Sequence, residues 1–83
     1  MKIVKPIYPD LARELGIDGP VYVYLLVGKD GRVMQAELDD KIAVPMLNES
    51  ALTAARQWVF KPALAQGHPV MVWVGEKFVF KLH

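Results

Sequence analysis

The chain has 83 residues and a formal net charge of +1, and 53% of its residues are hydrophobic. This length predicts a single domain, residues 1–83, and the absence of cysteine excludes a disulfide framework and a cysteine-based zinc site. The nearly balanced charge, without a run of one sign, indicates no nucleic-acid partner. No signal peptide is recognisable, and the longest apolar runs are far shorter than the ~20 residues of a membrane-spanning helix. Any membrane anchor is therefore expected outside the sequence given.

The first helix is predicted shortly after a lead-in, residues 1–5, whose order the sequence leaves open. Proline is well tolerated at a first helical position, so the Pro-containing segment that follows the lead-in favours a helix start. Leu11 and Leu15, four residues apart, would form its apolar stripe, and Gly16 would end it in a left-handed conformation. A helix of two turns is unstable alone, so we expect packing of Tyr8 and of both leucines to hold it.

A β-hairpin is predicted next, from two strands at residues 21–27 and 33–38. They flank the pair Asp30-Gly31, which is typical of a tight turn because glycine accepts positive φ. With a two-residue turn, three pairs would share one apolar face: Val27 with Met34, Leu25 with Ala36, and Val23 with Leu38. The other face holds a mixed set that we expect to be at least partly exposed: Tyr22, Tyr24, Leu26, Gln35 and Glu37.

A central amphipathic helix is predicted within residues 47–63. Asn48 would cap its start, after a connecting loop at residues 39–46, and Pro62 would end it. At the helical period, its small and apolar residues fall on one face: Leu47, Ala51, Leu52, Ala54, Ala55, Trp58 and Val59. The alanines would allow this face to lie close to a sheet.

A long final strand is predicted at residues 70–82, after a turn at residues 66–69. Glu76 would fall on its core face, so we expect a bulge or bend at Gly75. The resulting order of helix, strand, strand, helix and strand predicts an α+β domain of two layers, with two helices on one face of a three-stranded antiparallel sheet.

Residues that could carry chemistry are few. His68 and His83 have no partner at metal-ligand or triad spacing, and the adjacent carboxylates of Asp39-Asp40 would point apart in an extended segment. Ser50 and Thr53 have no base nearby in the sequence. We therefore expect a protein that is not an enzyme, with no catalytic residue, no metal site and no cofactor.

Two features could serve binding. If the final strand lies at a sheet edge, its unpaired backbone groups could accept an extended peptide, although Lys77 and Lys81 could equally be charges that blunt an edge strand. The apolar face around Tyr22, Tyr24 and Leu26 could be a partner or self-association surface, or could reflect ordinary cross-strand packing. These alternatives remain open on the residues alone.

Several motifs follow one another along nearly the whole chain. They are Tyr8-Pro9, Asp30-Gly31, the helix start at residues 47–52, RQWVFKPA at residues 56–63, and Phe-Lys-Leu at residues 80–82. In this order and spacing they resemble the C-terminal domain of the TonB family of energy transducers. The departures are modest: Asn48 and Ser50 stand where Asp and Ala are usual in the family, and Val59 replaces a residue that is commonly basic.

The resemblance implies a periplasmic domain, tethered to the inner membrane in its parent protein, which transmits force for energised transport. Its partners would be the N-terminal box peptide of an outer-membrane TonB-dependent receptor and, through segments outside this sequence, inner-membrane motor proteins. In the family, the box peptide adds as a strand beside the final strand, near the Tyr-Pro motif. By position, this implies the following peptide-binding residues: Tyr8, Pro9, Val70, Val72, Val74, Phe78, Val79, Phe80 and Lys81.

Two other functions remain alternatives. One is an envelope scaffolding domain, similar to the C-terminal domain of TolA, with a different protein partner. The other is a self-associating module, in which a homodimer exchanges or pairs the final strand between copies.

Overall fold

The computed structural model describes residues 1–39 and 44–82 of the chain. Asp40 and His83, considered above as candidate chemical groups, lie outside the described residues. The elements are, in chain order, α1 (Asp10–Glu14), β1 (Gly19–Val27), β2 (Val33–Leu38), α2 (Pro45–Arg56), β3 (Ala63–Ala65), β4 (His68–Val70) and β5 (Val72–Phe80).

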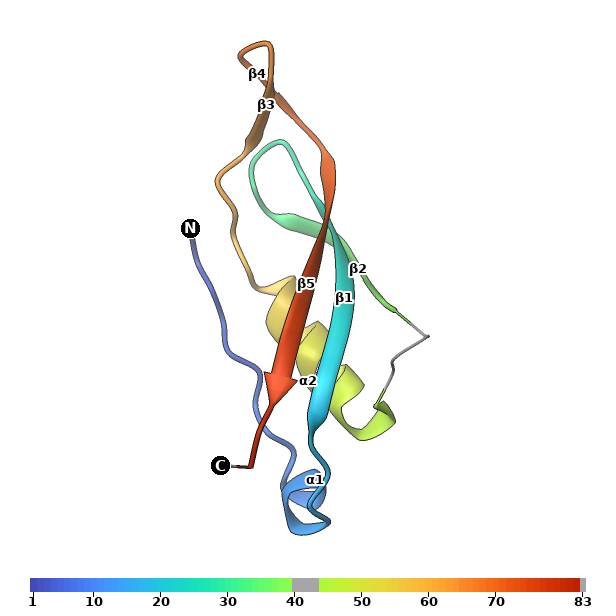
Figure 1. The fold of residues 1–83 in the computed structure, drawn as a ribbon. Helices are drawn as coiled ribbons and strands as arrows, with labels where there is room; N and C mark the ends of the chain where they lie inside the picture. Colours follow the sequence, from blue (N-terminus) through green and yellow to red (C-terminus); the bar gives the residue numbers. More distant parts are fainter. Residues whose placement is uncertain (40–43, 83) are drawn as a thin grey trace.

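The main sheet has three antiparallel strands in the order β2-β1-β5 (Figure 1). Helix α2 covers one face of this sheet, and α1 lies near the end of the sheet where β1 begins. The predicted α+β class, with a three-stranded antiparallel sheet and two helices, is confirmed.

A second, two-stranded hairpin was not predicted from the sequence. Strands β3 and β4 pair with each other and project beyond the main sheet (Figure 1). The turn between them contains Gln66 and Gly67 at φ angles of 52° and 80°, as in the tight turns that suit the twist of paired strands. The expected single strand at residues 70–82 is therefore two strands, with Val70 in β4 and β5 beginning at Val72.

The core lies between α2 and the inner face of the sheet. The odd-numbered residues of β1 from Val21 to Val27 are buried, as the predicted alternation requires. The predicted face of α2 is also buried: Leu47, Ala51, Leu52, Ala54 and Ala55. Because three of these residues are alanines, the helix axis approaches the strands closely, and each larger side chain buried here contributes about 1.5 to 3 kcal/mol.

Helix α2 begins and ends earlier than predicted. It starts at Pro45, with Val44 as N-cap and no side-chain cap, and it ends at Arg56. Proline suits this first position because its fixed φ is helical and it has no N–H to leave unpaired. The prediction of Asn48 as N-cap and of residues 45 and 46 as loop was therefore wrong. Asn48 lies within the first turns of the helix, and its buried Oδ1 has no hydrogen-bond partner among the described residues.

Helix α1 is held differently from the prediction. Leu11 and Leu15 are 56% and 58% exposed, whereas Ala12 is fully buried, so the predicted apolar stripe was wrong. A helix of only five residues presents little surface to the core, and here that surface is an alanine. Tyr8 does pack on the domain, and Gly16 adopts the predicted left-handed conformation at a φ of 69°.

The hairpin register is confirmed at two of the three predicted pairs. Leu25 lies opposite Ala36 and Val23 lies opposite Leu38, but Val27 lies opposite Val33 instead of Met34. The register shifts between Leu26 and Val27 because the turn is longer than two residues, with the Gly28 N–H donating to the Arg32 carbonyl at 2.8 Å.

Strand β5 contains no bulge. Its pairing with β1 is continuous, with Gly75 opposite Tyr24 and Glu76 opposite Val23, so the bend expected at Gly75 was wrong. Glu76 keeps the phase of the core face but stays half-exposed. Its carboxylate therefore reaches water without any distortion of the strand.

Candidate functional site

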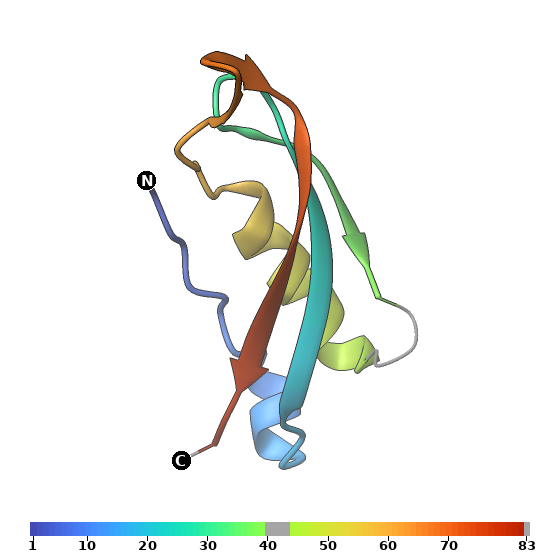
Figure 2. The same ribbon diagram turned by 45° about the horizontal axis from the view of Figure 1, so that its top comes forward.

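The open side of β5 is the most distinctive surface of the molecule. Strand β1 pairs with one side of β5, and no described strand pairs with the other (Figure 2). This places the final strand at a sheet edge, where unpaired backbone groups are available to another chain.

The hydrogen-bond pattern decides which β5 residues face the open side. The Asp39 N–H donates to the Tyr22 carbonyl at 2.9 Å, so the backbone groups of Tyr22 point toward β2. Because this direction alternates along a strand, Val21 points toward β5, where it lies opposite Phe78. The backbone groups of the intervening β5 residues are therefore directed away from β1: Trp73, Gly75, Lys77 and Val79.

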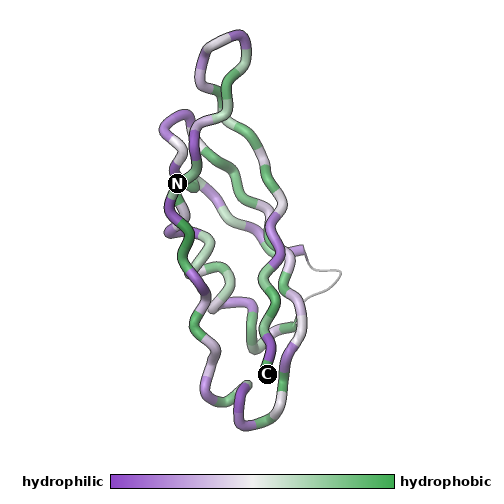
Figure 3. Tube along the Cα trace, turned by 60° about the vertical axis from the view of Figure 1, so that its left-hand side comes forward, coloured by the Kyte–Doolittle hydropathy of each residue, from purple (hydrophilic) through white to green (hydrophobic). Residues whose placement is uncertain are grey.

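The lead-in lies across from this edge and is attached to the domain. Lys2 and Val59 exchange two backbone hydrogen bonds, of 2.7 and 2.9 Å. The Trp58 indole Nε1 donates to the Val4 carbonyl at 2.8 Å, and just after the lead-in the Ser50 hydroxyl donates to the Ile7 carbonyl. Figure 3 shows this segment as an extended stretch that alternates between hydrophobic and hydrophilic residues.

A groove of about 440 Å³ separates the lead-in from the edge of β5. The lead-in contributes Val4 and Lys5 to its lining, Pro6 follows them, and β5 contributes Phe78 and Val79. Trp58 also lines the groove, where its ring packs edge-on against Phe78 with the centroids 5.5 Å apart. The groove therefore has an apolar lining beside a row of free backbone groups, which is the arrangement that recognises an extended peptide.

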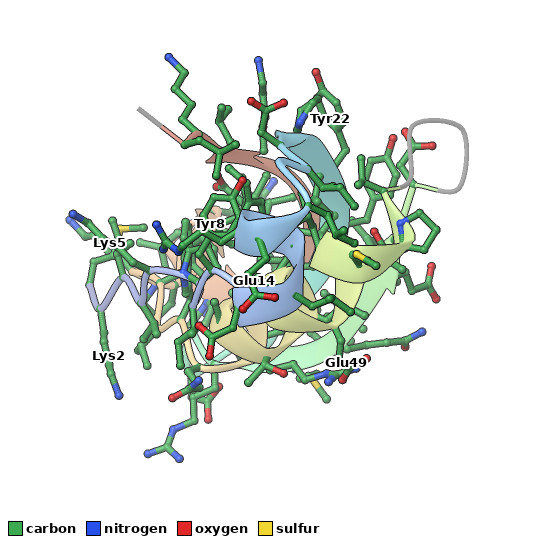
Figure 4. All side chains as sticks on the ribbon, turned by 90° about the horizontal axis from the view of Figure 1, so that it is seen from below. Lys2, Lys5, Tyr8, Glu14, Tyr22 and Glu49 are labelled. Carbon is green, nitrogen blue, oxygen red and sulfur yellow. The ribbon has the colours of Figure 1, made fainter. Side chains whose placement is uncertain are left out.

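Tyr8 lines the groove together with Phe80 and Lys81. Its ring packs edge-on against Phe80, its hydroxyl donates to the Ile17 carbonyl at 2.5 Å, and the Arg13 guanidinium lies 4.7 Å above the ring. Tyr8 is thus held in one orientation, and Figure 4 shows it between the lead-in and α1.

The structure brings together some of the predicted peptide-binding residues and separates others. Tyr8, Phe78, Val79, Phe80 and Lys81 all line the groove. The remaining residues do not line it: Pro9 is the N-cap of α1, Val70 belongs to β4, and Val72 and Val74 lie opposite the core-facing residues of β1.

Other groove residues were missed by the sequence analysis. Lys77 was considered only as a charge that blunts an edge, and Trp58 only as a core residue. Val4 and Lys5 belong to a lead-in that matches no specific motif. The alternation of basic and apolar residues in the lead-in was the only available signal, because its position beside β5 depends on long-range contacts.

The described side chains that were considered as possible catalytic groups show no arrangement typical of a reaction. Ser50 donates to the Ile7 carbonyl, and Asp39 accepts a 3.1 Å hydrogen bond from the Tyr24 hydroxyl. His68 is exposed in β4. Within residues 1–39 and 44–82, no group of three or more His, Cys, Asp or Glu side chains could hold a metal ion, and no helix is long and apolar enough to cross a membrane.

Comparison with known proteins assigns this architecture to a family. The family model described as "Gram-negative bacterial TonB protein C-terminal" matches residues 4–82. The chain belongs to the TonB C-terminal domain family. The resemblance noted from the motifs is therefore confirmed.

Similar proteins include two curated TonB proteins. The chain is 34% identical over 79 residues to Protein TonB of Vibrio cholerae, and 27% identical over 82 residues to Protein TonB of Pseudomonas aeruginosa. These matches cover 95% and 99% of this chain but only 32% and 24% of those proteins. This TonB-family chain thus spans about a third or less of the length of these relatives.

A solved structure has the same fold. The solution NMR structure of the Pseudomonas aeruginosa TonB CTD matches with a TM-score of 0.79 and 27% sequence identity. The match covers 98% of this chain and 82% of that one. The fold of this TonB-family domain is therefore shared almost from end to end.

Proposed function

We propose that this TonB-family domain is a non-catalytic module that binds the N-terminal box peptide of an outer-membrane TonB-dependent receptor. The peptide adds as a strand to the open edge of β5, and the joint transmits force for energised transport. The observation that carries this proposal is the row of outward-facing backbone groups between Trp73 and Val79, beside the groove formed by the lead-in.

The free energy of strand addition suits a contact between the peptide and β5 that can bear force and still dissociate. Each backbone hydrogen bond contributes only about 0.5 to 1.5 kcal/mol net, because the same groups bind water when the peptide is absent. Trp73, Gly75, Lys77 and Val79 would each contribute through their backbone groups, so a pull along the strand loads several bonds at once. The joint therefore resists force collectively, although each bond breaks readily.

The role of the whole protein extends this proposal. The matched region is the smaller part of the related TonB proteins, so an inner-membrane anchor and the contact with inner-membrane motor proteins would lie in the rest of the parent protein. We place the domain in the periplasm, where the box peptide of an outer-membrane receptor is accessible.

Self-association is the second candidate function. The open edge of β5 could also accept a strand from a second copy, and Tyr24 and Trp73 are both about half-exposed on the outer face of the sheet. Sedimentation measurements test this candidate directly. A dimer at every accessible concentration supports it, whereas a monomer that still binds box peptides supports the first proposal.

An NMR amide titration with a panel of receptor box peptides tests the proposed function. We expect shifts along β5 and at Lys5 and Tyr8, with new hydrogen-exchange protection at Lys77 and Val79, whose amides face the open side. The amides of Gly28 and Asp39, which are already paired within the hairpin and at its end, serve as internal controls. If no peptide of the panel shifts the β5 amides of the folded monomer, the proposal is wrong and a scaffolding role becomes the better interpretation.

A further inference from the structure

The charged residues that line the groove beside β5 are all lysines. Lys5 lies on the lead-in wall, and Lys77 and Lys81 lie on the strand wall. Among the described residues that line this groove there is no Asp or Glu. The formal net charge of the chain is only +1, so this local excess of positive charge is not a general property of the surface.

The side chains of β5 alternate between the core side and the outer face of the sheet, so an added strand would have two different environments. Phe78 and Phe80 point into the core side, whereas Lys77, Val79 and Lys81 are exposed. Residues directly opposite each other in paired strands share a face. A peptide residue opposite Phe78 would therefore enter the apolar groove near Trp58, and a residue opposite Lys77 or Lys81 would lie on the outer face.

Lys77 makes an aromatic contact on the outer face of the sheet, and no ion pair between described residues involves a lysine of the groove. The Lys77 Nζ lies 5.8 Å from the centre of the Tyr22 ring, on the outer face of the sheet. Figure 4 shows Tyr22 on the opposite side of the domain from Glu49 of α2, and Lys5 extending outward from the lead-in. The ion pairs found within the described part of the chain join Arg32 to Asp30 and Arg56 to Glu49, and none involves a lysine of the groove.

We infer that the segment accepted by this groove is an acidic peptide of alternating pattern, with carboxylate side chains opposite Lys77 and Lys81 and an apolar side chain opposite Phe78. This inference rests on the proposed strand addition and adds the chemistry that selects among extended peptides. Backbone hydrogen bonds do not discriminate between sequences, whereas opposite charges placed across two strands do. Selection among peptides then depends on the side chains of Lys77 and Lys81. Affinity depends largely on the backbone hydrogen bonds of β5.

Three synthetic peptides test the inference. The first alternates Glu and Val, the second alternates Gln and Val, and the third has the composition of the first with its Glu residues in one block. We expect the alternating Glu peptide to bind about three- to tenfold more tightly than the Gln peptide at low salt, with the difference shrinking as salt increases. We expect the blocked peptide to lose most of this advantage, because it cannot place carboxylates on one face.

Matched variants locate the effect. In the double variant Lys77→Gln and Lys81→Gln, the preference for Glu over Gln should disappear. The control double variant Lys29→Gln and Lys61→Gln removes the same charge from sites outside the groove and should keep the preference.

The possible outcomes distinguish the preference for acidic peptides from strand addition itself. If the Glu and Gln peptides bind equally, or if the blocked peptide binds as tightly as the alternating one, the inference is overturned while strand addition stands, provided the β5 amides still shift. If neither these peptides nor any receptor box peptide shifts those amides, both the inference and the proposed function are overturned.

Discussion

The Phe60 carbonyl oxygen lies 2.0 Å from the position that a Cβ on Gly31 would occupy, and the Phe60 N–H donates to the Gly31 carbonyl at 2.7 Å. This contact joins the β1-β2 hairpin to the segment that follows α2. It therefore helps to position Trp58, which lies two residues earlier and forms part of the groove.

Replacing Gly31 by alanine should be strongly destabilising. Gly31 has a φ of 87°, and the added Cβ would collide with backbone, which cannot move as a flexible side chain can. We expect a loss of more than about 2 kcal/mol in the free energy of unfolding, measured by urea denaturation. Gly67→Ala is the matched control, because Gly67 has a similar φ of 80° but nothing within 4 Å of its Cβ position, so it should lose only about 1 kcal/mol. Equal losses in the two variants would mean that the Gly31 contact is unimportant.

Trp58→Ala should destabilise the domain by about 3 to 5 kcal/mol, because Trp58 is only 9% exposed and packs against Phe78. Trp73→Ala is the control, since Trp73 is 51% exposed, and we expect a loss below about 1 kcal/mol. Thermal or urea unfolding followed by circular dichroism measures both. A small loss at Trp58 would contradict its assignment to the core.

The contribution of the Trp58 indole hydrogen bond to stability should be measurable separately from that of the packing of its ring. Trp58→Phe keeps an aromatic ring but removes the donor to the Val4 carbonyl. We expect a modest loss of stability, about 1 kcal/mol beyond the change in packing, together with increased hydrogen exchange at the Lys2 amide. Unchanged protection of that amide would show that the backbone pairing with Val59 holds the lead-in by itself.

Val79→Pro should weaken peptide addition without unfolding the domain. The Val79 amide faces the open side, so a proline removes a hydrogen bond to the peptide and none to β1. Val79→Thr is the control, because it keeps both the amide and a β-branched side chain. We expect box-peptide affinity to fall severalfold in the proline variant only, as measured by NMR titration. If circular dichroism instead shows an unfolded proline variant, the assigned direction of the Val79 amide is wrong.

Tyr24 should titrate above the ordinary pKa of 10.0 for tyrosine. The hydrogen bond to Asp39 raises the pKa of Tyr24 most, and the negative charge of Asp39 adds to this effect, because both favour the protonated phenol. This interaction stabilises the fold fully below pH 10 and is lost as the pH rises through the higher pKa of the folded state. Ultraviolet titration of phenolate should show the pKa decrease in Asp39→Asn. No decrease would mean that another group controls Tyr24.

Local patterns predicted much of the fold correctly. The alternation in β1, the buried face of α2 and two of three hairpin pairs follow from periods of 2 and 3.6 residues, which depend on near neighbours only. The wrong predictions include the ends of α2, the length of the hairpin turn, the apolar stripe of α1 and the bend at Gly75. Val27 pairs with Val33 because the turn is longer than two residues, and α2 begins at Pro45 because a proline start has no N–H to leave unpaired.

By itself the sequence determined the family, the antiparallel sheet and the placing of Tyr8 and Phe80 within motifs of a fixed order, because these are properties of local pattern and spacing. Only the tertiary structure decided that the lead-in lines a groove beside β5 and that alternate backbone groups of β5 face it. Those features depend on contacts such as Trp58 Nε1 to the Val4 carbonyl, which join residues distant in the chain. No local pattern encodes such a contact, since it forms only when α2 and the sheet have packed together.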